Sequence, residues 1–537
     1  MEQVSVRLPE YPQLFGGAGF HNNDATLYHI IDPEFFRQAV CKDYREISPG
    51  FMRTFAGFDD WTKEAMDEFA EYYEQMQKWT DTPMYLTAGN GKRHFSEKEM
   101  EDYCERVAQK LDYLYHEKSV RHIRYYCFSN EMSCGMWGVL LDDLPRFKQY
   151  HVYLYRAFAR HNLPVGLLAT DASGYKAWST MDYVAANMAD ITEDYCFHIY
   201  EQEHGIHDLQ FYDFFYKKCR EVVEKAIGHF GKRVILGEIG IQKNDGGHLH
   251  FNGNVILDVC RYFEDPYEEA YCALMLTEMM FAAINAGIFQ MAIWTFLDHP
   301  DPYSCAYSTG DDYARRWGEA EHFFSCTMDT KYNRWGFLPW EGKEGPRALY
   351  YCIAFLMKLF KKNSKVLECS ADDPELRMCG IMNRDGSVSI GIVNRGKSEK
   401  TICLQSSLFK KDIRAYVYDP ARVRKNRFGD LPAAETVIPM NAPEYTIRPE
   451  SVVFLTTDYL DKAGHVYADG VKVSEGRLIW NAVSNPDHCY YRVFAGKDED
   501  FVPAFENQIA STVAEELPID DADLYYRVLS VDKSGNI

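Results

Sequence analysis

The sequence predicts an α/β protein, with a (β/α)8 TIM barrel followed by an all-β sandwich and a smaller β domain. Two observations predict the barrel. Between about residues 13 and 360, short apolar runs alternate with helical patterns eight times, and several of the runs end abruptly in polar residues. Strands that alternate with helices are typical of a parallel barrel. After residue 360, short alternating runs separated by turn residues predict the β domains.

The eight barrel strands are expected at residues 14–20, 51–55, 84–88, within the stretch 123–135, and at 164–169, 191–200, 233–242 and 288–296. Helices are expected over about residues 60–78 and 209–229, after a capping box at Ser96 and Glu99, and before Gly287. The competing fold is an open doubly wound sheet. It would carry a glycine-rich phosphate turn after the first strand, whereas GGAGF lies within or before that strand and fits GxGxxG poorly.

Length and charge limit the classes of function. A chain of 537 residues predicts two or three domains. The 80 acidic and 58 basic residues give a net charge of −22, which argues against a nucleic acid or an anionic membrane as partner. The N-terminus lacks a signal pattern, and no run approaches the ~20 apolar residues of a membrane span. The expected location is therefore cytoplasmic, or secreted if a signal was removed.

The 15 cysteines are scattered and form no CxxC pair, so we interpret them as small buried apolar residues. A nucleophilic cysteine at Cys127 or Cys134 is the less favoured alternative. No metal and no cofactor are expected.

Two carboxylates stand at predicted strand ends. Asn130 and Glu131 follow the fourth strand, and Glu238 lies between glycines at the seventh. The C-terminal ends of barrel strands carry the chemistry of such enzymes. Hydrolysis of a glycosidic bond with retention needs one carboxyl as proton donor and another as nucleophile, about 5–5.5 Å apart. The alternative for Asn130 and Glu131 is a helix N-cap.

Further polar and aromatic side chains lie on other expected strands: Arg53, His198, Tyr200 and Trp294. Together with the Asn-Glu pair and Glu238, they resemble the clan A retaining glycoside hydrolases over roughly the first 360 residues. WTFLD at residues 294–298 and the following β-sandwich are similar to the family that contains β-xylosidases and α-L-iduronidase. Met132 departs from that pattern, because many members have proline there.

This resemblance implies a role for each residue and a carbohydrate as substrate. Glu131 is expected to act as general acid and then as base, and Glu238 as the nucleophile. Arg53 and a hydrogen bond from Tyr200 are expected to keep Glu238 ionised, while Asn130 binds the sugar 2-hydroxyl.

Four other residues are expected to bind or position the sugar. His198 orients a neighbour or binds a hydroxyl, Trp294 forms the floor of the sugar subsite, and His21 and Asp24 bind hydroxyls. The alternative for Arg53 is pairing with a core carboxylate, and for His198, Tyr200 and Trp294 it is ordinary packing.

The expected domains are the catalytic barrel at 1–362, the β-sandwich at 363–460 and a last module at 461–537. GRLIWNAVS, HCYYRVFAG and DLYYRVLSVDKSGNI in the last module, with Trp480, resemble a fibronectin type III domain. That fold would require one more strand beyond Ile537, so the module is expected to be incomplete or completed in another way.

A long loop at residues 298–345 is expected to wall the site and make an exo-acting pocket. Its aromatic residues offer stacking faces for sugars: Tyr303, Trp317, Trp335 and Trp340. The alternative is a satellite subdomain with its own small core.

Two other functions remain open. One is a metal-dependent barrel hydrolase, suggested by closely spaced histidines: His204, His207, His248 and His250. The other is a non-catalytic carbohydrate-binding protein on a barrel scaffold.

Overall fold

The computed structural model describes the chain except for residues 59–60, 88–94, 132–139, 175–177, 203–209, 229–230, 243–247, 252–253, 258–265, 301–331, 334–335, 341–344, 461–465 and 534–537. Of the residues expected to contribute to function, Cys134, His204, His207, Tyr303, Trp317 and Trp335 lie outside the described residues.

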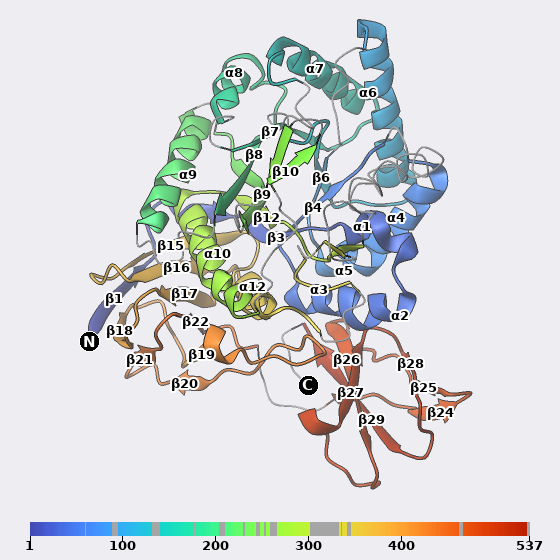
Figure 1. Ribbon diagram of the computed structural model, residues 1–537, viewed down its shortest axis with the longest axis vertical. Coiled ribbons are helices and arrows are strands. Elements are labelled where there is room, and N and C mark those ends of the chain that lie inside the picture. The colour runs from blue at the N-terminus through green and yellow to red at the C-terminus, as the bar shows by residue number, and fades with distance from the viewer. Residues whose placement is uncertain are drawn as a thin grey trace.

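Eight parallel strands close into a barrel (Figure 1) in the order β12-β3-β4-β5-β6-β7-β8-β9, which confirms the predicted fold class. They are β3 (Gly17–His21), β4 (Phe51–Phe55), β5 (Met84–Thr87), β6 (Ile123–Cys127), β7 (Gly166–Ser173), β8 (Asp194–Gln202), β9 (Val234–Gln242) and β12 (Gln290–Ile293). Closure is seen at β12, where Met291 pairs with Leu236 of β9 on one side and with Ala18 of β3 on the other.

The first expected strand, residues 14–20, is wrong as a single element. Leu14–Phe15 forms a separate strand, β2, which pairs with the sandwich at Ser364, and the barrel strand starts only at Gly17. Gly17 has a φ of +123°, and a Cβ there would lie 2.8 Å from the backbone of Gly50. The chain therefore turns at a position that only glycine can occupy, and the two short strands belong to different sheets.

Helices cover the outside of the barrel (Figure 1). Between β3 and β5 they are α1 (Asp24–Leu27), α2 (Pro33–Phe35), α3 (Cys41–Ile47), α4 (Lys63–Gln75) and α5 (Gln77–Thr80). The later ones are α6 (Glu97–Asp112), α7 (Leu144–Arg160), α8 (Thr180–Asn187), α9 (Phe211–Gly228), α10 (Pro266–Ala286) and α12 (Ala348–Leu359). The capping box at Ser96 and Glu99 is present, and Gly287 follows α10 with a φ of +99°. No helix in the described part of the chain has the length and apolar character to cross a membrane.

The β-sandwich includes the N-terminus of the chain. Its strands run in the order β20-β19-β22-β17-β16-β15-β1-β18-β21. The bounds are β1 (Glu2–Arg7), β15 (Ser364–Ser370), β16 (Leu376–Met382), β17 (Val388–Asn394), β18 (Lys400–Gln405), β19 (Ile413–Tyr418), β20 (Thr436–Ile438), β21 (Glu444–Ile447) and β22 (Ser451–Thr456). β1 lies between β15 and β18, and its Val4 and Val6 pack in one core with Ile390 and Ile402. The first strand of the chain thus completes a domain that was expected to begin at residue 363.

The C-terminal module has two sheets, β23-β29-β26-β27 and β24-β25-β28. Its strands are β23 (Val466–Tyr467), β24 (Lys472–Ser474), β25 (Arg477–Ile479), β26 (His488–Gly496), β27 (Gln508–Thr512), β28 (Glu516–Pro518) and β29 (Tyr525–Asp532). Trp480 is buried and its ring packs 5.4 Å from that of Tyr491. At the edge of the larger sheet, β23 pairs antiparallel with β29. The similarity to fibronectin type III stays a prediction.

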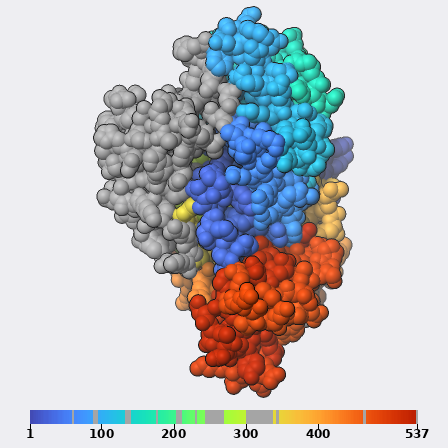
Figure 2. Space-filling model, turned by 90° about the vertical axis from the view of Figure 1, so that its right-hand side faces the viewer, coloured from blue at the N-terminus to red at the C-terminus, as the bar shows by residue number. Residues whose placement is uncertain are grey.

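Buried ion pairs join the three parts of the chain. The ammonium of Lys42, on α3, lies 2.6 Å from Glu46 and 2.8 Å from Asp430 of the sandwich. Arg492 of the C-terminal module lies 3.4 Å from the same Asp430, and the hydroxyl of Tyr490 donates to Glu46. Figures 1 and 2 show the C-terminal module packed under the barrel beside α2 and α3.

Candidate active site

Arg53 of β4 is the centre of a buried cluster at the C-terminal ends of the barrel strands. Its Nη1 donates to Glu238 Oε1 at 2.6 Å and to His21 Nδ1 at 2.8 Å. Its Nη2 donates to Asn130 Oδ1 at 2.5 Å and to Asp171 Oδ2 at 3.1 Å. Burial alone would lower the pKa of Arg53, but Glu238 and Asp171 raise it well above its ordinary value. One fixed cation therefore joins side chains from β3, β4, β7, β9 and the loop after β6.

Glu238 lies near the middle of β9 and is 4% exposed. Besides Arg53, the hydroxyl of Tyr200 donates a hydrogen bond to its Oε2. Burial raises the pKa of Glu238 above its ordinary value, while the charges of His198 and Arg53 and the hydrogen bond from Tyr200 oppose that rise. A carboxylate held by two cations and a hydroxyl, with one edge toward the barrel mouth, suits a nucleophile.

Glu131 directly faces Glu238. One carboxylate oxygen of each residue and a nitrogen of His198 all lie within 4.8 Å of one another. The side chain of Glu131 is 17% exposed, against 5% for that of Glu238. The backbone of Glu131 has a φ of +42°, a left-handed conformation that is rare for this residue type. The more exposed carboxyl group is thus held at the rim, where a leaving group would depart.

His198 of β8 bridges the two carboxylates. It is completely buried, with Nδ1 3.2 Å from Glu131 Oε1 and 3.6 Å from Glu238 Oε2. Its Nε2 lies 2.8 Å from Asp171 Oδ1. Burial alone would lower the pKa of His198, but Asp171 and Glu238 raise it to about 10. The imidazole is therefore protonated at neutral pH.

Aromatic rings form one side of the cluster. The ring of Trp294 lies 4.4 Å from that of His21, and Phe55 packs against both. Trp294 is half-buried. The sequence analysis did not single out Phe55, although it ends the strand that carries Arg53.

Asp24 lies apart from the other expected site residues. It is fully buried, and it accepts hydrogen bonds from the Tyr72 hydroxyl at 2.6 Å and from the Asn22 amide at 3.1 Å. Burial raises its pKa to about 6. These contacts tie the start of α1 to α4, and the sugar-binding role of Asp24 stays a prediction.

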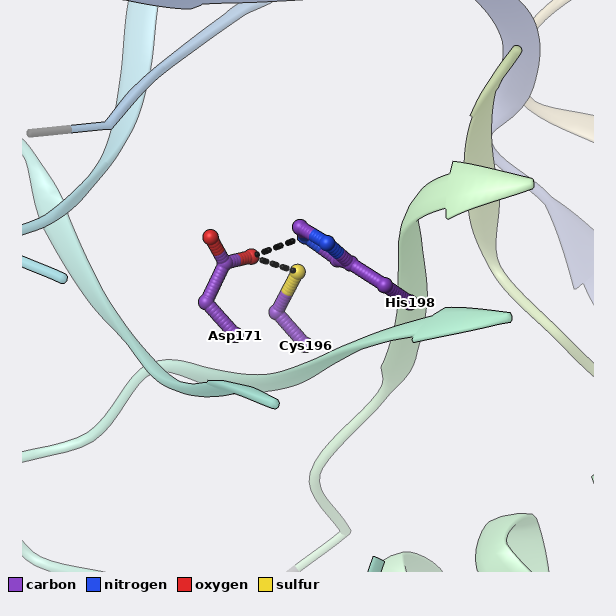
Figure 3. A group of neighbouring side chains, drawn as sticks. All are labelled: Asp171, Cys196 and His198. Atoms are coloured by element: carbon purple, nitrogen blue, oxygen red, sulfur yellow. Dashed lines mark hydrogen bonds and ion pairs between the residues drawn. The ribbon is translucent and has the colours of Figure 1, made fainter. Parts of the chain in front are cut away.

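The structure adds residues that the sequence analysis did not assign to the site. Asp171 and Cys196 are buried beside His198, and Figure 3 shows both the Cys196 thiol and the His198 ring directed at one oxygen of Asp171. The residue before Glu238 is a glycine because a side chain would not fit there: a Cβ at residue 237 would lie 2.6 Å from Cys196 Sγ. The sequence pattern that predicts Glu131 also fits Asp171. Glu131 follows a barrel strand, and Asp171 lies in the last part of one.

Among the described residues, two groups of side chains could hold a metal ion: Asp171, Cys196 and His198, and Glu131, His198 and Glu238. In both groups the donor atoms are already hydrogen-bonded to one another or to Arg53. Arg53 contacts Asp171 and Glu238, and its charge opposes the binding of a metal ion there. His248 and His250 lie on β10 (His248–Phe251), which pairs with β11 (Asn254–Leu257).

The remaining candidates are placed as follows. Cys127 is fully buried, and burial raises the pKa of its thiol to about 12, so it is not an activated nucleophile. Trp340 is partly buried and packs against the main core.

This fold is shared with glycoside hydrolases of clan A. No protein-family model matches the sequence, and no curated protein matches it. Among solved structures, a GH51 arabinofuranosidase from Xanthomonas axonopodis pv. citri matches with a TM-score of 0.57 and 12% identity, over 85% of this chain and 100% of that chain.

Two more solved structures show the same likeness. The catalytic domain of GH30 xylanase C from Talaromyces cellulolyticus has a TM-score of 0.56 and 11% identity, with 84% of this chain and 99% of that chain covered. A family 51 α-L-arabinofuranosidase from Bifidobacterium longum has a TM-score of 0.56 and 13% identity, with 85% and 99% covered. The predicted resemblance to clan A is confirmed at the level of the fold, while the closer likeness to the β-xylosidase and α-L-iduronidase family stays a prediction.

Proposed function

We propose that the protein is a retaining glycoside hydrolase. The observation that carries this proposal is the closeness of Glu131 and Glu238, since one carboxylate oxygen of each lies within 4.8 Å of the other. Retaining enzymes place their two carboxyl groups about 5–5.5 Å apart, whereas inverting enzymes need about 6.5–9.5 Å to admit a water molecule. The fold shared with xylanases and arabinofuranosidases supports the same class of reaction.

In the first step, protonated Glu131 gives its proton to the glycosidic oxygen while Glu238 attacks the anomeric carbon. The bond from that carbon to the leaving oxygen breaks, and an ester bond to Glu238 forms. The leaving group departs as an alcohol. In the second step, ionised Glu131 takes a proton from water, the water oxygen bonds to the anomeric carbon, and the ester breaks to release Glu238.

Neighbouring residues bind the sugar. We place the face of Trp294 under the ring that is cleaved, and Asn130 at its 2-hydroxyl, where Arg53 fixes the amide oxygen and leaves the amide nitrogen to face the substrate. His21 packs on Trp294 and is the second candidate for a sugar hydroxyl. We further propose exo action on oligosaccharides or small glycosides, which release of internal fragments from a long polysaccharide would contradict.

The test begins with a panel of chromogenic monosaccharide glycosides. With an active substrate, NMR of the first product should show the anomeric configuration of the substrate, and a matching 2-fluoro glycoside should label Glu238 in a peptide map. Inversion at the anomeric carbon, or label on another residue, would refute the assignment. Binding of glycosides without turnover would favour a non-catalytic carbohydrate-binding protein.

Glu238→Gln should abolish turnover because it removes the nucleophile but keeps a side chain of the same shape. We expect a loss of at least about a thousandfold in kcat, near the upper range for single groups of catalytic machinery. Circular dichroism and Tm verify that the variant is folded. Retained activity in a folded variant would contradict the role of Glu238.

A further inference from the structure

Asp171 near the end of β7 is a completely buried charged group beside the site. It is 0% exposed, and both carboxylate oxygens are occupied by donors. Oδ1 lies 2.8 Å from His198 Nε2 and accepts from the Cys196 thiol at 3.1 Å (Figure 3). Oδ2 accepts from Arg53 at 3.1 Å and from the Thr87 hydroxyl at 3.4 Å. These contacts keep Asp171 ionised and hold its pKa well below the ordinary range against the effect of burial.

Three carboxyl groups surround His198: those of Asp171, Glu131 and Glu238. A neutral imidazole has one N–H and one lone pair, so with its N–H on Asp171 the lone pair of Nδ1 would meet a carboxylate oxygen of Glu238 or take the proton that Glu131 needs as general acid. Here Nε2 faces Asp171, and Nδ1 faces both Glu131 and Glu238. The other charged or titratable neighbours are Arg53, whose charge opposes protonation, and Cys196, whose thiol is neutral because burial raises its pKa well above the ordinary value.

We propose that Asp171 is a positioning residue that fixes His198 as a doubly protonated imidazole, so that a single buried cation touches both reacting carboxylates throughout the reaction. This proposal rests on the proposed function, because it concerns the fate of charge between Glu131 and Glu238.

The reason lies in how charge moves in the first step. Before it, the negative charge is on Glu238, which Arg53 contacts at 2.6 Å. After it, Glu238 is a neutral ester and the charge is on Glu131, for which the described contacts include His198 but not Arg53. An imidazolium placed between the two carboxylates stabilises both states without moving, as a preorganised site requires.

The direct test is a histidine NMR titration that needs no substrate. In uniformly 15N-histidine-labelled protein, the His198 signals are assigned by their loss in His198→Gln. We expect both ring nitrogens of His198 to remain protonated from pH 6 to 9 in the unaltered protein. In Asp171→Asn, the pKa of His198 should fall from about 10 toward its ordinary value near 6.5. Asparagine tolerates the left-handed backbone at this position, where φ is +56°.

Asp194→Asn is the matched control. Asp194 opens the strand that carries His198, is also buried, and accepts hydrogen bonds from Arg233 and Tyr125 instead of contacting His198. The pKa of His198 should be unchanged in this variant. With an active glycoside, Asp171→Asn should lower kcat by about tenfold to a hundredfold, the range for one charge-assisted hydrogen bond, with a much smaller change in KM.

Each outcome separates this proposal from the proposed function. A neutral His198 at pH 8 in the unaltered protein overturns the role of Asp171, even if Asp171→Asn fails to fold. An unchanged His198 titration in a folded Asp171→Asn variant overturns it as well. Conversely, the expected titration in a protein that cleaves no glycoside would uphold the Asp171–His198 pair and refute the proposed function.

Discussion

Glu131 and Asp171 both have left-handed backbones, with φ of +42° and +56°. Such conformations cost of order 1–3 kcal/mol for a residue other than glycine and occur mainly where surrounding contacts enforce them. Asp171 is held by four donors, and Glu131 faces His198 and Glu238. At both residues the left-handed backbone accompanies a carboxylate that contacts His198. This is what we expect of side chains that are held in position for a reaction.

Tyr200 has a measurable effect on the ionisation of Glu238. Its hydroxyl donates to Glu238 and lowers the pKa of that carboxyl group, so Tyr200→Phe should raise the pKa further. As the proposed nucleophile, Glu238 must be ionised, so activity should be lost as pH falls through this pKa. We expect the acid limb of kcat/KM to move upward by about one to two pH units, since a hydrogen bond to a charged group contributes about 1.5–3 kcal/mol.

Tyr195→Phe is the control for this pH profile. Tyr195 lies on the same strand, and its hydroxyl has no hydrogen-bond partner among the described residues. Its removal should leave the acid limb in place. If the fall of kcat/KM at low pH occurs at the same pH in Tyr200→Phe as in the unaltered protein, another group limits activity there.

At the scale of the elements, β8 and β9 pair beside the site, where Cys196 and His198 of β8 lie next to Gly237 and Glu238 of β9. Gly237 of β9 leaves room for Cys196 of β8, and a Cβ at residue 237 would also lie 3.0 Å from Asp171 Oδ1 and from His198 Nε2. The glycine therefore sets the spacing at which these side chains reach one another.

Gly237→Ala should disturb this spacing. Overpacking of this kind costs about 1–3 kcal/mol, and here the strain falls on His198 and Asp171, so both Tm and kcat should decrease. Gly228→Ala at the end of α9 is the matched substitution, because a Cβ there meets no atom within 4 Å and should change neither quantity. Full activity in Gly237→Ala would indicate that β8 and β9 can separate without consequence for the site.

For the whole molecule, the buried charges around Lys42 link the barrel to both β domains. Burial alone would lower the pKa of Lys42, but Asp430, Glu46 and Asp43 raise it well above its ordinary value. Removal of one partner from such a group leaves uncompensated buried charge. This cluster is formed by α3 and the β domains, away from the strand ends that carry the site.

Lys42→Met should therefore destabilise the protein by about 3–5 kcal/mol without a change in the kinetics of the folded enzyme at low temperature. Thermal unfolding and kcat/KM measured on the same sample separate the two effects. Lys63→Met removes an exposed ion pair with Asp67 and should leave Tm nearly unchanged. Equal stability of the two variants would mean that the buried cluster contributes nothing.

The barrel and most of its site could be predicted from the sequence because both follow local rules. Apolar runs predict the strands, and polar residues within or directly after these runs predict Arg53, Glu131 and Glu238. Asp171 has the same signal, but its function depends on His198 and Arg53, which pairing across the barrel brings to it. Asp24 also stands after a strand, yet it lies on a helix that turns it toward Tyr72. Whether a polar residue near a strand end joins the site depends on contacts between residues far apart in the sequence, and a local sequence pattern does not contain that information.

The placement of β1 also bears on how the polypeptide is made. Its partners, Ser370 on one side and Ile402 on the other, leave the ribosome only after the barrel residues have been synthesised. Until then both edges of β1 lack their partners, and an unpaired strand edge is prone to pairing with other chains. The sandwich therefore cannot close around β1 before the barrel residues have been synthesised.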